Sequence, residues 1–283
     1  MITKKQLIIN ADDFGMSESI NLAVLDAYKN GILTSASLLA NGPAFGHSVS
    51  LLKEMQGIGL AVHLNIIEFS TLQKNIKPDS LLYDRNGRYN NGFVKLLLKS
   101  FNHDFLKEVE EDFRLQIEKV LAYTPVDHID SHVHVHAIPN IFKIVCRLAK
   151  EYGIKNIRTQ FEYPYFVPDI KKYLSLKYPV NLIKVMILNT FTLINRQVID
   201  KDYFSTNENI IGVNYTGCMD TATISAALKN VREKTELLVH PCIDRSMHSR
   251  IFEYQAIVDE GLRQQIADCD IDLINFAGKL KFI

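Results

Sequence analysis

Four of the nine histidines lie within one ten-residue stretch, Asp127 to His136. Read as an extended strand, this stretch puts five polar side chains on one face: His128, Asp130, His132, His134 and His136. If the strand instead ends near His132 and the chain coils, a spacing of four residues keeps His132 and His136 together. Both geometries bring imidazoles together, and neutral imidazole is the commonest biological metal ligand. The stretch therefore indicates a metal or catalytic site rather than a solvated loop.

Other polar residues stand where apolar runs end. Asp12 and Asp13 follow the run Leu7 to Ala11, His63 interrupts the run Ile58 to Ile66, and His240 closes the run that begins at Leu237. Taken singly, each has a plain structural explanation. An aspartate pair can cap the following helix, and a lone buried histidine is commonly only a hydrogen-bonded core residue. Their shared position at strand ends is the stronger argument for function.

Together these residue types provide a set of groups for hydrolysis. One carboxylate oxygen and two or three imidazole nitrogens make an open divalent-metal site with room for water. A second carboxylate beside it can act as general base for that water. Because neighbouring residues on an extended chain point in opposite directions, Asp12 and Asp13 should have separate tasks. His240 then offers a proton donor from another strand.

Alternating strands and helices must position these groups. Apolar runs of strand length alternate with helical patterns, which predicts a parallel sheet with helical crossovers and an active face at the carboxyl ends of the strands. Helices are expected at about 17–30, 45–55, 106–123, 139–152, 221–233 and 250–268, the last of them a single long helix. The expected strands are 7–11, 33–41, 58–66, 126–130, 154–158, 210–214, 237–240 and 271–276.

We expect one domain over residues 1–283 with one loop-rich insertion. Residues 68–102 contain Pro78, Asn86-Gly87 and Asn91-Gly92, all typical of turns, and suit an excursion over the barrel mouth that serves as a lid or a substrate-binding loop. Residues 164–202 are expected to be irregular and partly helical, because Pro168 and Pro179 interrupt them.

The composition narrows the classes of function. The 283-residue chain has 32 basic and 32 acidic residues, and this balance argues against nucleic acid as the main partner while fitting a neutral substrate. Its four widely spaced cysteines favour free thiols in a reducing compartment over a disulfide framework. The first apolar run is too short for a signal peptide, and no stretch has the length of a membrane span. We therefore expect a cytoplasmic protein.

Five ordered motifs resemble those of the YdjC-like carbohydrate deacetylases, the family that includes chitooligosaccharide deacetylase. They span most of the chain, and a pattern from Arg250 to Glu253 near its end also fits the family. The motifs are 9–17 (INADDFGMS), 30–35 (NGILTS), 62–64 (VHL), 128–136 (HIDSHVHVH) and 238–241 (LVHP).

The resemblance implies a fold, an activity and roles for residues. The fold would be a distorted (β/α) barrel of seven to eight mostly parallel strands, similar to the polysaccharide deacetylases. The activity would be removal of the N-acetyl group from a chitooligosaccharide such as diacetylchitobiose, or from a related amino sugar. The implied metal ligands are Asp13, His63 and His132, with Asp12 as base and His240 as acid. Additional ligands or supporting residues are sought among His136, His134, Asp130 and Arg158, and Arg158 is either a partner of Asp12 or part of an ion pair elsewhere.

Cofactor and assembly are also implied by the resemblance. Family members are described with one Mg²⁺ ion, whereas an oxygen and two imidazoles equally suit Zn²⁺, Co²⁺ or Mn²⁺. A homodimer is expected from family habit, with a small oligosaccharide as substrate and neither nucleic acid nor membrane as a partner.

Two residues depart from the family pattern. Val133 stands where members often have the middle of three histidines, so no role can be assigned to that position. Cys242 replaces a glycine after His240-Pro241 and is expected to be packed rather than to bind metal. Two rival functions stay open on the sequence alone: a metal-dependent phosphoesterase on a His-rich barrel, and a sugar-binding protein without catalysis.

Overall fold

A curled parallel sheet forms the centre of the molecule. The computed structural model describes residues 4–168 and 177–281. Its strands follow the order β6-β5-β4-β3-β2-β1-β8-β7, and β9 pairs with β1 off this path. Every ladder between these strands is parallel. The strands are β1 (Lys5–Phe14), β2 (Ser35–Leu38), β3 (Gly59–Leu64), β4 (His128–Ser131), β5 (Asn156–Ile157), β6 (Ser205–Thr206), β7 (Asn209–Ile211), β8 (Thr235–Val239) and β9 (Ile271–Leu273).

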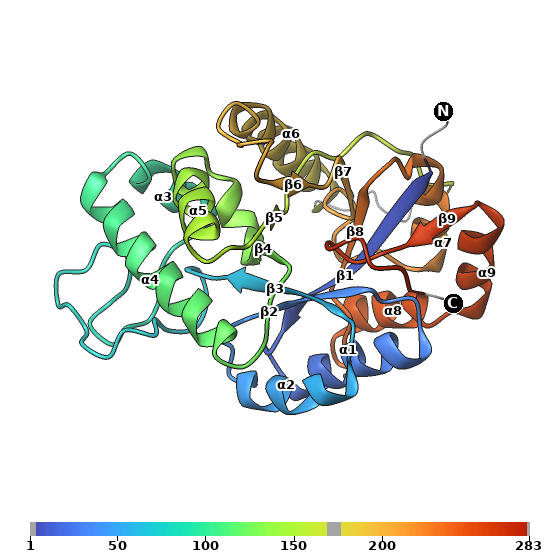
Figure 1. The fold of residues 1–283 in the computed structure, drawn as a ribbon, viewed down its shortest axis with the longest axis horizontal. Coiled ribbons are helices and arrows are strands. Elements are labelled where there is room, and N and C mark those ends of the chain that lie inside the picture. Colours follow the sequence, from blue (N-terminus) through green and yellow to red (C-terminus); the bar gives the residue numbers. More distant parts are fainter. Residues whose placement is uncertain (1–3, 169–176, 282–283) are drawn as a thin grey trace.

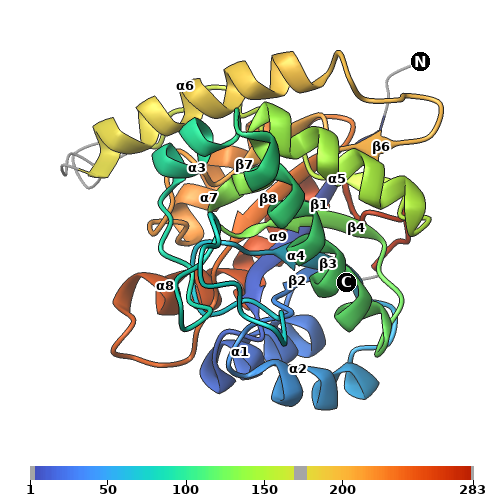
Figure 2. The ribbon, with the colours of Figure 1, turned by 90° about the vertical axis from the view of Figure 1, so that its left-hand side faces the viewer.

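Helices surround this sheet on its outer side (Figures 1 and 2). A parallel strand must return through a crossover, so helices connect most of the strands and cover the sheet. The α-helices are α1 (Glu18–Asn30), α2 (Phe45–Leu51), α3 (Phe93–Lys99), α4 (His103–Leu121), α5 (Pro139–Glu151), α6 (Lys177–Asn195), α7 (Thr221–Ala227), α8 (His248–Ile257) and α9 (Glu260–Asp268). Short 3-10 helices are η1 (Leu52–Glu54), η2 (His132–Ala137) and η4 (Leu228–Asn230).

The sheet curls into a half-barrel with one interrupted seam. β6 and β7 follow one another in the chain, yet in the described residues they share no ladder. Ile210 of β7 instead donates its backbone N–H to the carbonyl of Phe161, which follows β5 (2.9 Å). The predicted distorted barrel of mostly parallel strands is thereby confirmed.

The apolar runs that predicted the inner strands are buried in the core. All residues of β2, β3, β4 and β8 are buried, as expected for strands with helices on one side and barrel contents on the other. Ser17 caps α1, its side chain accepting the backbone N–H of Ile20, at the start that the sequence indicated.

Several predicted elements are wrong in extent. The single helix expected over 250–268 is two helices, because Asp259 starts a new one by accepting the backbone N–H of Leu262. The helix expected over 221–233 ends as α-helix at Ala227 and continues only as the 3-10 turn η4. α3, within the insertion, and the two-residue strand β6 were not predicted.

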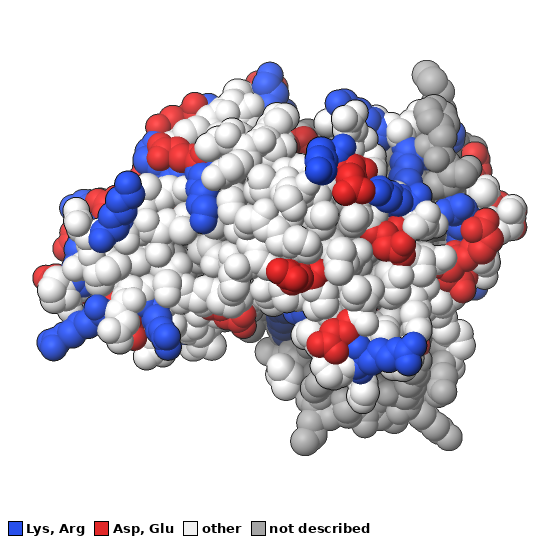
Figure 3. All heavy atoms as spheres, turned by 90° about the horizontal axis from the view of Figure 1, so that it is seen from below, with Lys and Arg blue, Asp and Glu red and all other residues white. Residues whose placement is uncertain are grey.

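The described helices include none that combines the length and the apolar character of a membrane span. On the face seen from below, lysine and arginine side chains are scattered among acidic ones and separated by uncharged areas (Figure 3). This mixture reflects the balanced composition of the chain.

Candidate metal centre

The carboxyl ends of neighbouring strands bring the polar motifs together. Asp13 stands at the end of β1, His63 near the end of β3, and His132 directly after β4. Each offers a ligand atom, and these three atoms lie within 4.8 Å of one another. Residues separated by 119 positions in the chain thus form one buried cluster.

Asp13 owes its position to an irregular stretch of β1. The pairing register of β1 with β2 shifts between Ala11 and Phe14, and Asp13 has a φ of 68°. A side chain in this left-handed region carries strain, which is common at functional sites. The turn lets both aspartates lie at the barrel mouth although they are adjacent in sequence.

The carboxylate of Asp13 lies between positive groups. Its Oδ1 accepts a hydrogen bond from Nδ1 of His132 (2.8 Å), and its Oδ2 accepts one from the guanidinium of Arg250 (2.7 Å). Burial alone would raise the pKa of Asp13, but His132, His240 and Arg250 hold that pKa well below its usual range. Asp13 therefore offers an ionised oxygen donor.

His63 presents one ring nitrogen to this carboxylate. Its Nδ1 donates to Oδ1 of Asp130 (2.7 Å), which fixes the ring, and its Nε2 lies 3.7 Å from Oδ1 of Asp13. That Nε2 is buried without a hydrogen-bond partner among the described residues. Burial lowers the pKa of His63, yet the charges of Asp130, Asp12 and Asp13 outweigh it, so the pKa is raised. A histidine that binds a metal commonly donates one ring nitrogen to a carboxylate and leaves the other nitrogen open for the ion.

The His-rich stretch does not stay extended. β4 ends at Ser131, and the chain then turns through Val133 and His134, with φ of 51° and 60°. The prediction that five alternating polar residues share one strand face is wrong, because these two left-handed residues end the alternation after Ser131. The other reading, a strand that ends near His132, is closer to the structure.

The turn places the imidazole of His132 beside the carboxylate of Asp13. Its Nε2 lies 3.7 Å from a carboxylate oxygen of Glu68, at the start of the insertion. Burial lowers the pKa of His132, but the hydrogen bond to Asp13 and the nearby carboxylate of Glu68 raise it to about 9.

Asp12 belongs to a second, fully buried charge network. The guanidinium of Arg158 donates to both carboxylate oxygens of Asp12 (3.0 and 2.8 Å). Arg158 also contacts Asp130 (2.7 Å) and donates through Nε to Glu236 (2.8 Å). Arg158 is thus the partner of Asp12, the first of the two roles considered from the sequence.

His240 reaches the same rim from β8. The buried carboxylate of Glu253 accepts the backbone N–H of His240 (2.5 Å) and lies 3.5 Å from its Nδ1. The His240 side chain is 20% exposed, whereas the side chains of Asp13 and His63 are 1% exposed. Its charge is one of those that lower the pKa of Asp13.

His136, His134 and Cys242 have other surroundings. Nδ1 of His136 pairs with the Ser131 hydroxyl, and its Nε2 donates to the carbonyl of Arg158 (3.1 Å), so in this arrangement neither nitrogen faces the cluster. His134 is buried with its Nδ1 unpaired in the described chain, and burial puts its pKa well below the usual range. Cys242 is buried, and its thiol pairs with the Ser19 hydroxyl (3.4 Å), which matches the expectation of a packed residue.

The donor set fits a divalent cation. Asp13, His63 and His132 supply one oxygen and two nitrogens, with an orphaned imidazole nitrogen aimed at the carboxylates. A second grouping of Asp12, His63 and Asp130 is also compact, but Arg158 already pairs with both of its carboxylates. We therefore favour the first grouping as the metal centre.

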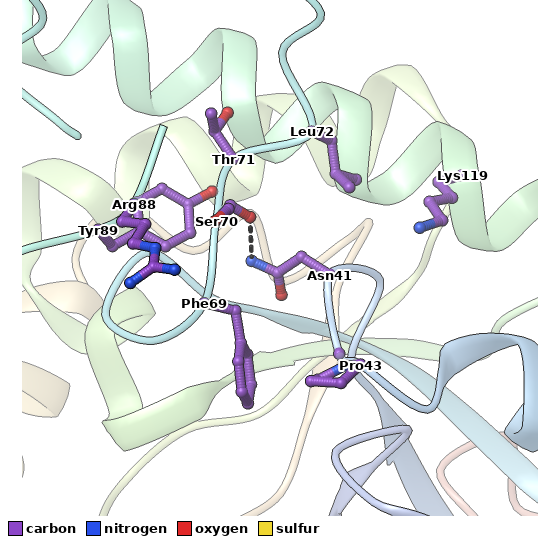
Figure 4. Close-up of a pocket in the computed structure, with 10 residues that line it drawn as sticks. Asn41, Pro43, Phe69, Ser70, Thr71, Leu72, Arg88, Tyr89 and Lys119 are labelled. Atoms are coloured by element: carbon purple, nitrogen blue, oxygen red, sulfur yellow. Dashed lines mark hydrogen bonds between the residues drawn. The ribbon is translucent and has the colours of Figure 1, made fainter. Parts of the chain in front are cut away.

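A pocket of about 620 Å³ opens where the insertion meets the loop after β2 (Figure 4). Its walls are the loop after β2, with Asn41 and Pro43, and two parts of the insertion that include Phe69 and Arg88. Asn41 spans them, because its side chain donates to the carbonyl of Ser70 (3.1 Å). Phe69 directly follows Glu68, which contacts His132, so the pocket and the metal centre share one segment of chain.

The sequence analysis missed several supporting residues. Asn10 donates to Asp12 and to Ser37, Ser37 donates to Asp130, and Arg250 holds Asp13. Asn10 and Asp12 are two positions apart on β1 and therefore lie on the same face, so this spacing could have identified Asn10 from the sequence. Arg250 and Glu253 were noticed only as a pattern, and nothing in the local sequence connects Arg250 to Asp13, which is 237 positions away.

Comparison with known proteins identifies a family and several relatives of this chain. A family model described as YdjC-like protein matches residues 6–268. A carbohydrate deacetylase from Clostridium beijerinckii is 40% identical over 150 residues, which cover 53% of this chain and 58% of that protein. A chitooligosaccharide deacetylase from Salmonella schwarzengrund is 34% identical over 157 residues, covering 53% and 58%. The matched region thus spans less than two thirds of these relatives.

A solved structure shares the fold over nearly the whole chain. It is a protein of Enterococcus faecalis V583, named provisionally as a cellobiose-phosphate cleavage protein, with a TM-score of 0.72 and 22% identity. The similarity covers 97% of this chain and 98% of that one.

Proposed function

The chain belongs to the YdjC-like protein family, and from this we propose that it is a metal-dependent deacetylase of N-acetylated amino sugars, with a short chitooligosaccharide as substrate. The observation that carries the proposal is the cluster of Asp13, His63 and His132, with Asp12 and His240 on the same rim. A binding protein has no need for a separate acid and base around such a centre. The names of the relatives, carbohydrate deacetylase and chitooligosaccharide deacetylase, support the substrate class.

The chain's own residues divide the work. A divalent ion held by Asp13, His63 and His132 would supply Lewis acidity toward the attacking water and the acetamide carbonyl. Asp12 accepts the proton of that water as its oxygen adds to the carbonyl carbon. His240 donates a proton to the amide nitrogen as the C–N bond breaks, so the products are acetate and a free amine.

Two residues position this acid and base. Arg158 grips both oxygens of Asp12 and so limits its rotation. Glu253 fixes the backbone of His240 and lies beside its Nδ1, so Nε2 is the nitrogen directed away from Glu253. A base and an acid that are both held in place lower the entropy cost of reaching the transition state.

The pocket between the insertion and the loop after β2 is the proposed site for the sugar chain. A volume of about 620 Å³ lies in the usual range for small-molecule sites. Asn41, Ser70 and Arg88 offer polar groups to hydroxyls, while Phe69 and Pro43 offer apolar faces to a sugar ring (Figure 4). The N-acetyl group of a sugar in this pocket would reach the metal centre past Glu68.

Metal identity is a separate part of the proposal. Magnesium is the expectation from the family, whereas two imidazole ligands favour zinc, cobalt or manganese. Elemental analysis of protein purified without added metal, followed by activity after removal and return of each ion, distinguishes them.

Acetate release from diacetylchitobiose tests the proposal. We expect acetate from the untreated protein, loss of release with a chelator, and recovery with a divalent ion. Asp12→Asn should lower kcat by about 10² to 10⁴ by removing the base. Absence of acetate release under every metal condition would contradict the proposed function.

Two variants compare an aspartate at the site with one outside it. Asp130 and Asp127 each pair with a histidine (2.7 and 2.6 Å), but only Asp130 pairs with a histidine of the candidate centre, and only Asp130 also contacts Arg158. Asp130→Asn should lower activity or metal affinity about 10- to 100-fold. Asp127→Asn should leave both nearly unchanged.

A further inference from the structure

One buried carboxylate of helix α4 lies outside the metal centre and has no part in the proposed chemistry. Asp112 is fully buried, and within the described part of the chain no cation pairs with it. Its two oxygens accept hydrogen bonds from neutral groups: the Tyr89 hydroxyl (2.6 Å), the Gln116 side-chain amide (2.8 Å) and the Thr71 hydroxyl. Burial raises the pKa of Asp112 against the effect of these donors. A buried acid without an opposite charge is costly, which makes it a candidate for a functional role.

Two of these donors belong to the wall of the pocket proposed for the sugar. Thr71 and Tyr89 both line that pocket and come from two separate segments of the insertion (Figure 4). The segments also pair with each other, because the backbone N–H of Tyr89 donates to the carbonyl of Phe69 (3.1 Å). The single carboxylate of Asp112 thus connects both segments of the wall to α4.

The third donor leads toward the metal centre. Gln116 accepts the backbone N–H of Asn65 and donates to the carbonyl of the same residue (both 2.8 Å). Asn65 directly follows β3 and lies two positions after His63. Its side chain accepts the N–H of Glu68 (3.1 Å), the residue whose carboxylate approaches the imidazole of His132. A continuous series of hydrogen bonds therefore joins the pocket wall to the elements of the metal centre.

We propose that Asp112 is a positioning residue for the substrate, which holds the wall of the sugar pocket at a fixed place relative to the metal centre. This role rests on the proposed function, because it takes the pocket as the site of the sugar chain. A fully satisfied buried network is rigid. A sugar bound against such a wall keeps its N-acetyl group aligned with the centre. Asp112 is buried and acts through Thr71 and Tyr89 rather than by touching the sugar.

A second carboxylate of α4 provides a matched comparison. Glu108 lies four positions before Asp112 on the same helix. Its carboxylate accepts the Ser80 hydroxyl (2.6 Å) and the backbone N–H groups of Leu81 and Leu82 (3.1 and 3.2 Å). Glu108 therefore also connects the insertion to α4, but the residues that it binds do not line the pocket. If Asp112 only stabilised the insertion, changing either residue should have the same effect on the sugar.

Steady-state kinetics with diacetylchitobiose test the role. Asp112→Ala should raise KM about 10-fold, the equivalent of one hydrogen bond, while kcat changes by less than about threefold. Glu108→Ala should leave KM unchanged. The affinity for the metal, measured by calorimetry, should be the same in both variants, because Gln116 still holds Asn65. Thermal unfolding shows that each variant is folded.

Milder variants test the same network if Asp112→Ala does not fold. Tyr89→Phe removes one donor and keeps the ring in the pocket wall, and it should raise KM by about 3- to 10-fold. Combined with Asp112→Asn, it should raise KM by less than the product of the two single effects, because both changes act on one network. Effects on KM that multiply would show that Tyr89 acts only by its own contact with the sugar, and would overturn the proposal.

Sugar binding provides a measurement that does not depend on turnover. Calorimetric titration with diacetylchitobiose in the Asp12→Asn background should show a dissociation constant about 10-fold higher when Asp112→Ala is added. Bound sugar without acetate release from the wild type would contradict the deacetylase function and leave the role of Asp112 standing. A folded Asp112→Ala with the KM and sugar affinity of Glu108→Ala would overturn that role even if acetate is released. Absence of sugar binding by the parent protein would overturn both.

Discussion

Arg158 is the residue on which the buried charges depend. It is fully buried and contacts Asp12, Asp130 and Glu236, three carboxyl groups that are themselves buried. Removing one partner of a buried ion pair leaves uncompensated charge in a medium of low dielectric constant.

We therefore predict that Arg158→Ala lowers the free energy of unfolding by about 3–5 kcal/mol. Arg147→Ala removes a surface arginine that pairs with Glu110 and should change stability by about 1 kcal/mol or less. Urea unfolding measures both. Equal changes in the free energy of unfolding for the two variants would show that burial of the Arg158 network does not determine its contribution to stability.

Glu162 predicts a pH dependence of stability. Burial raises its pKa to about 7, although the backbone N–H groups of Gly212 and Asn214 and the charge of Lys184 act in the opposite direction. Between pH 4.5 and 7 the unfolded chain releases this proton while the folded chain keeps it. The folded state then binds more protons, so stability falls as pH rises through this window and levels off above it.

The measurement is the unfolding midpoint of the wild type and Glu162→Gln at pH 5 and pH 7.5. The wild type should lose up to about 3 kcal/mol more than the variant between these values. Parallel changes in both proteins would assign the pH dependence to other groups.

At the level of elements, the sequence predicted those strands and helices that have a clear apolar pattern and clear turn or capping residues at their ends. The apolar runs located β1, β3, β4 and β8, and the polar residues Asp13, His63 and His132 at the ends of β1, β3 and β4 form the candidate metal centre. Short strands such as β6 have too few residues for a pattern, and the division between α8 and α9 depends on the local capping by Asp259. The left-handed turn at Val133 and His134 has no clear sequence signature, since a β-branched residue such as Val133 strongly disfavours that conformation.

The close packing of two loops at the rim is a testable feature of these elements. A Cβ on Gly42, after β2, would lie 2.3 Å from the carbonyl oxygen of Gly15, which follows Asp13 and Phe14. This contact holds the loop of the metal centre against the loop that lines the pocket.

Gly42→Ala should therefore destabilise the protein by about 1–3 kcal/mol by overpacking and lower acetate release by displacing the Asp13 loop. The control is Gly46→Ala in α2, where nothing lies within 4 Å of the new Cβ and alanine should stabilise the helix by up to about 1 kcal/mol. Thermal unfolding and activity are the measurements. An active, fully stable Gly42→Ala would mean that the loops adjust freely.

At the level of the whole molecule, the metal centre joins the ends of β1, β3 and β4. A cation that binds only the folded chain stabilises it by mass action, about 2.7 kcal/mol at one hundred times the dissociation constant. Because the centre connects strands whose cluster residues are up to 119 positions apart in the sequence, this gain applies to global unfolding.

Addition of the activating ion should raise the unfolding temperature of the wild type by several degrees and leave that of Asp13→Asn unchanged. Scanning calorimetry with and without chelator measures the difference. A variant that gains as much as the wild type would locate the ion elsewhere.

The strained turn at Val133 has a consequence for protein engineering. A β-branched residue in the left-handed region opposes folding, and asparagine accepts that conformation far more readily. Val133→Asn is thus a candidate for greater heat tolerance. Because asparagine favours the same left-handed conformation, the bend that presents His132 should persist, and the gain in heat tolerance should leave the position of that imidazole unchanged.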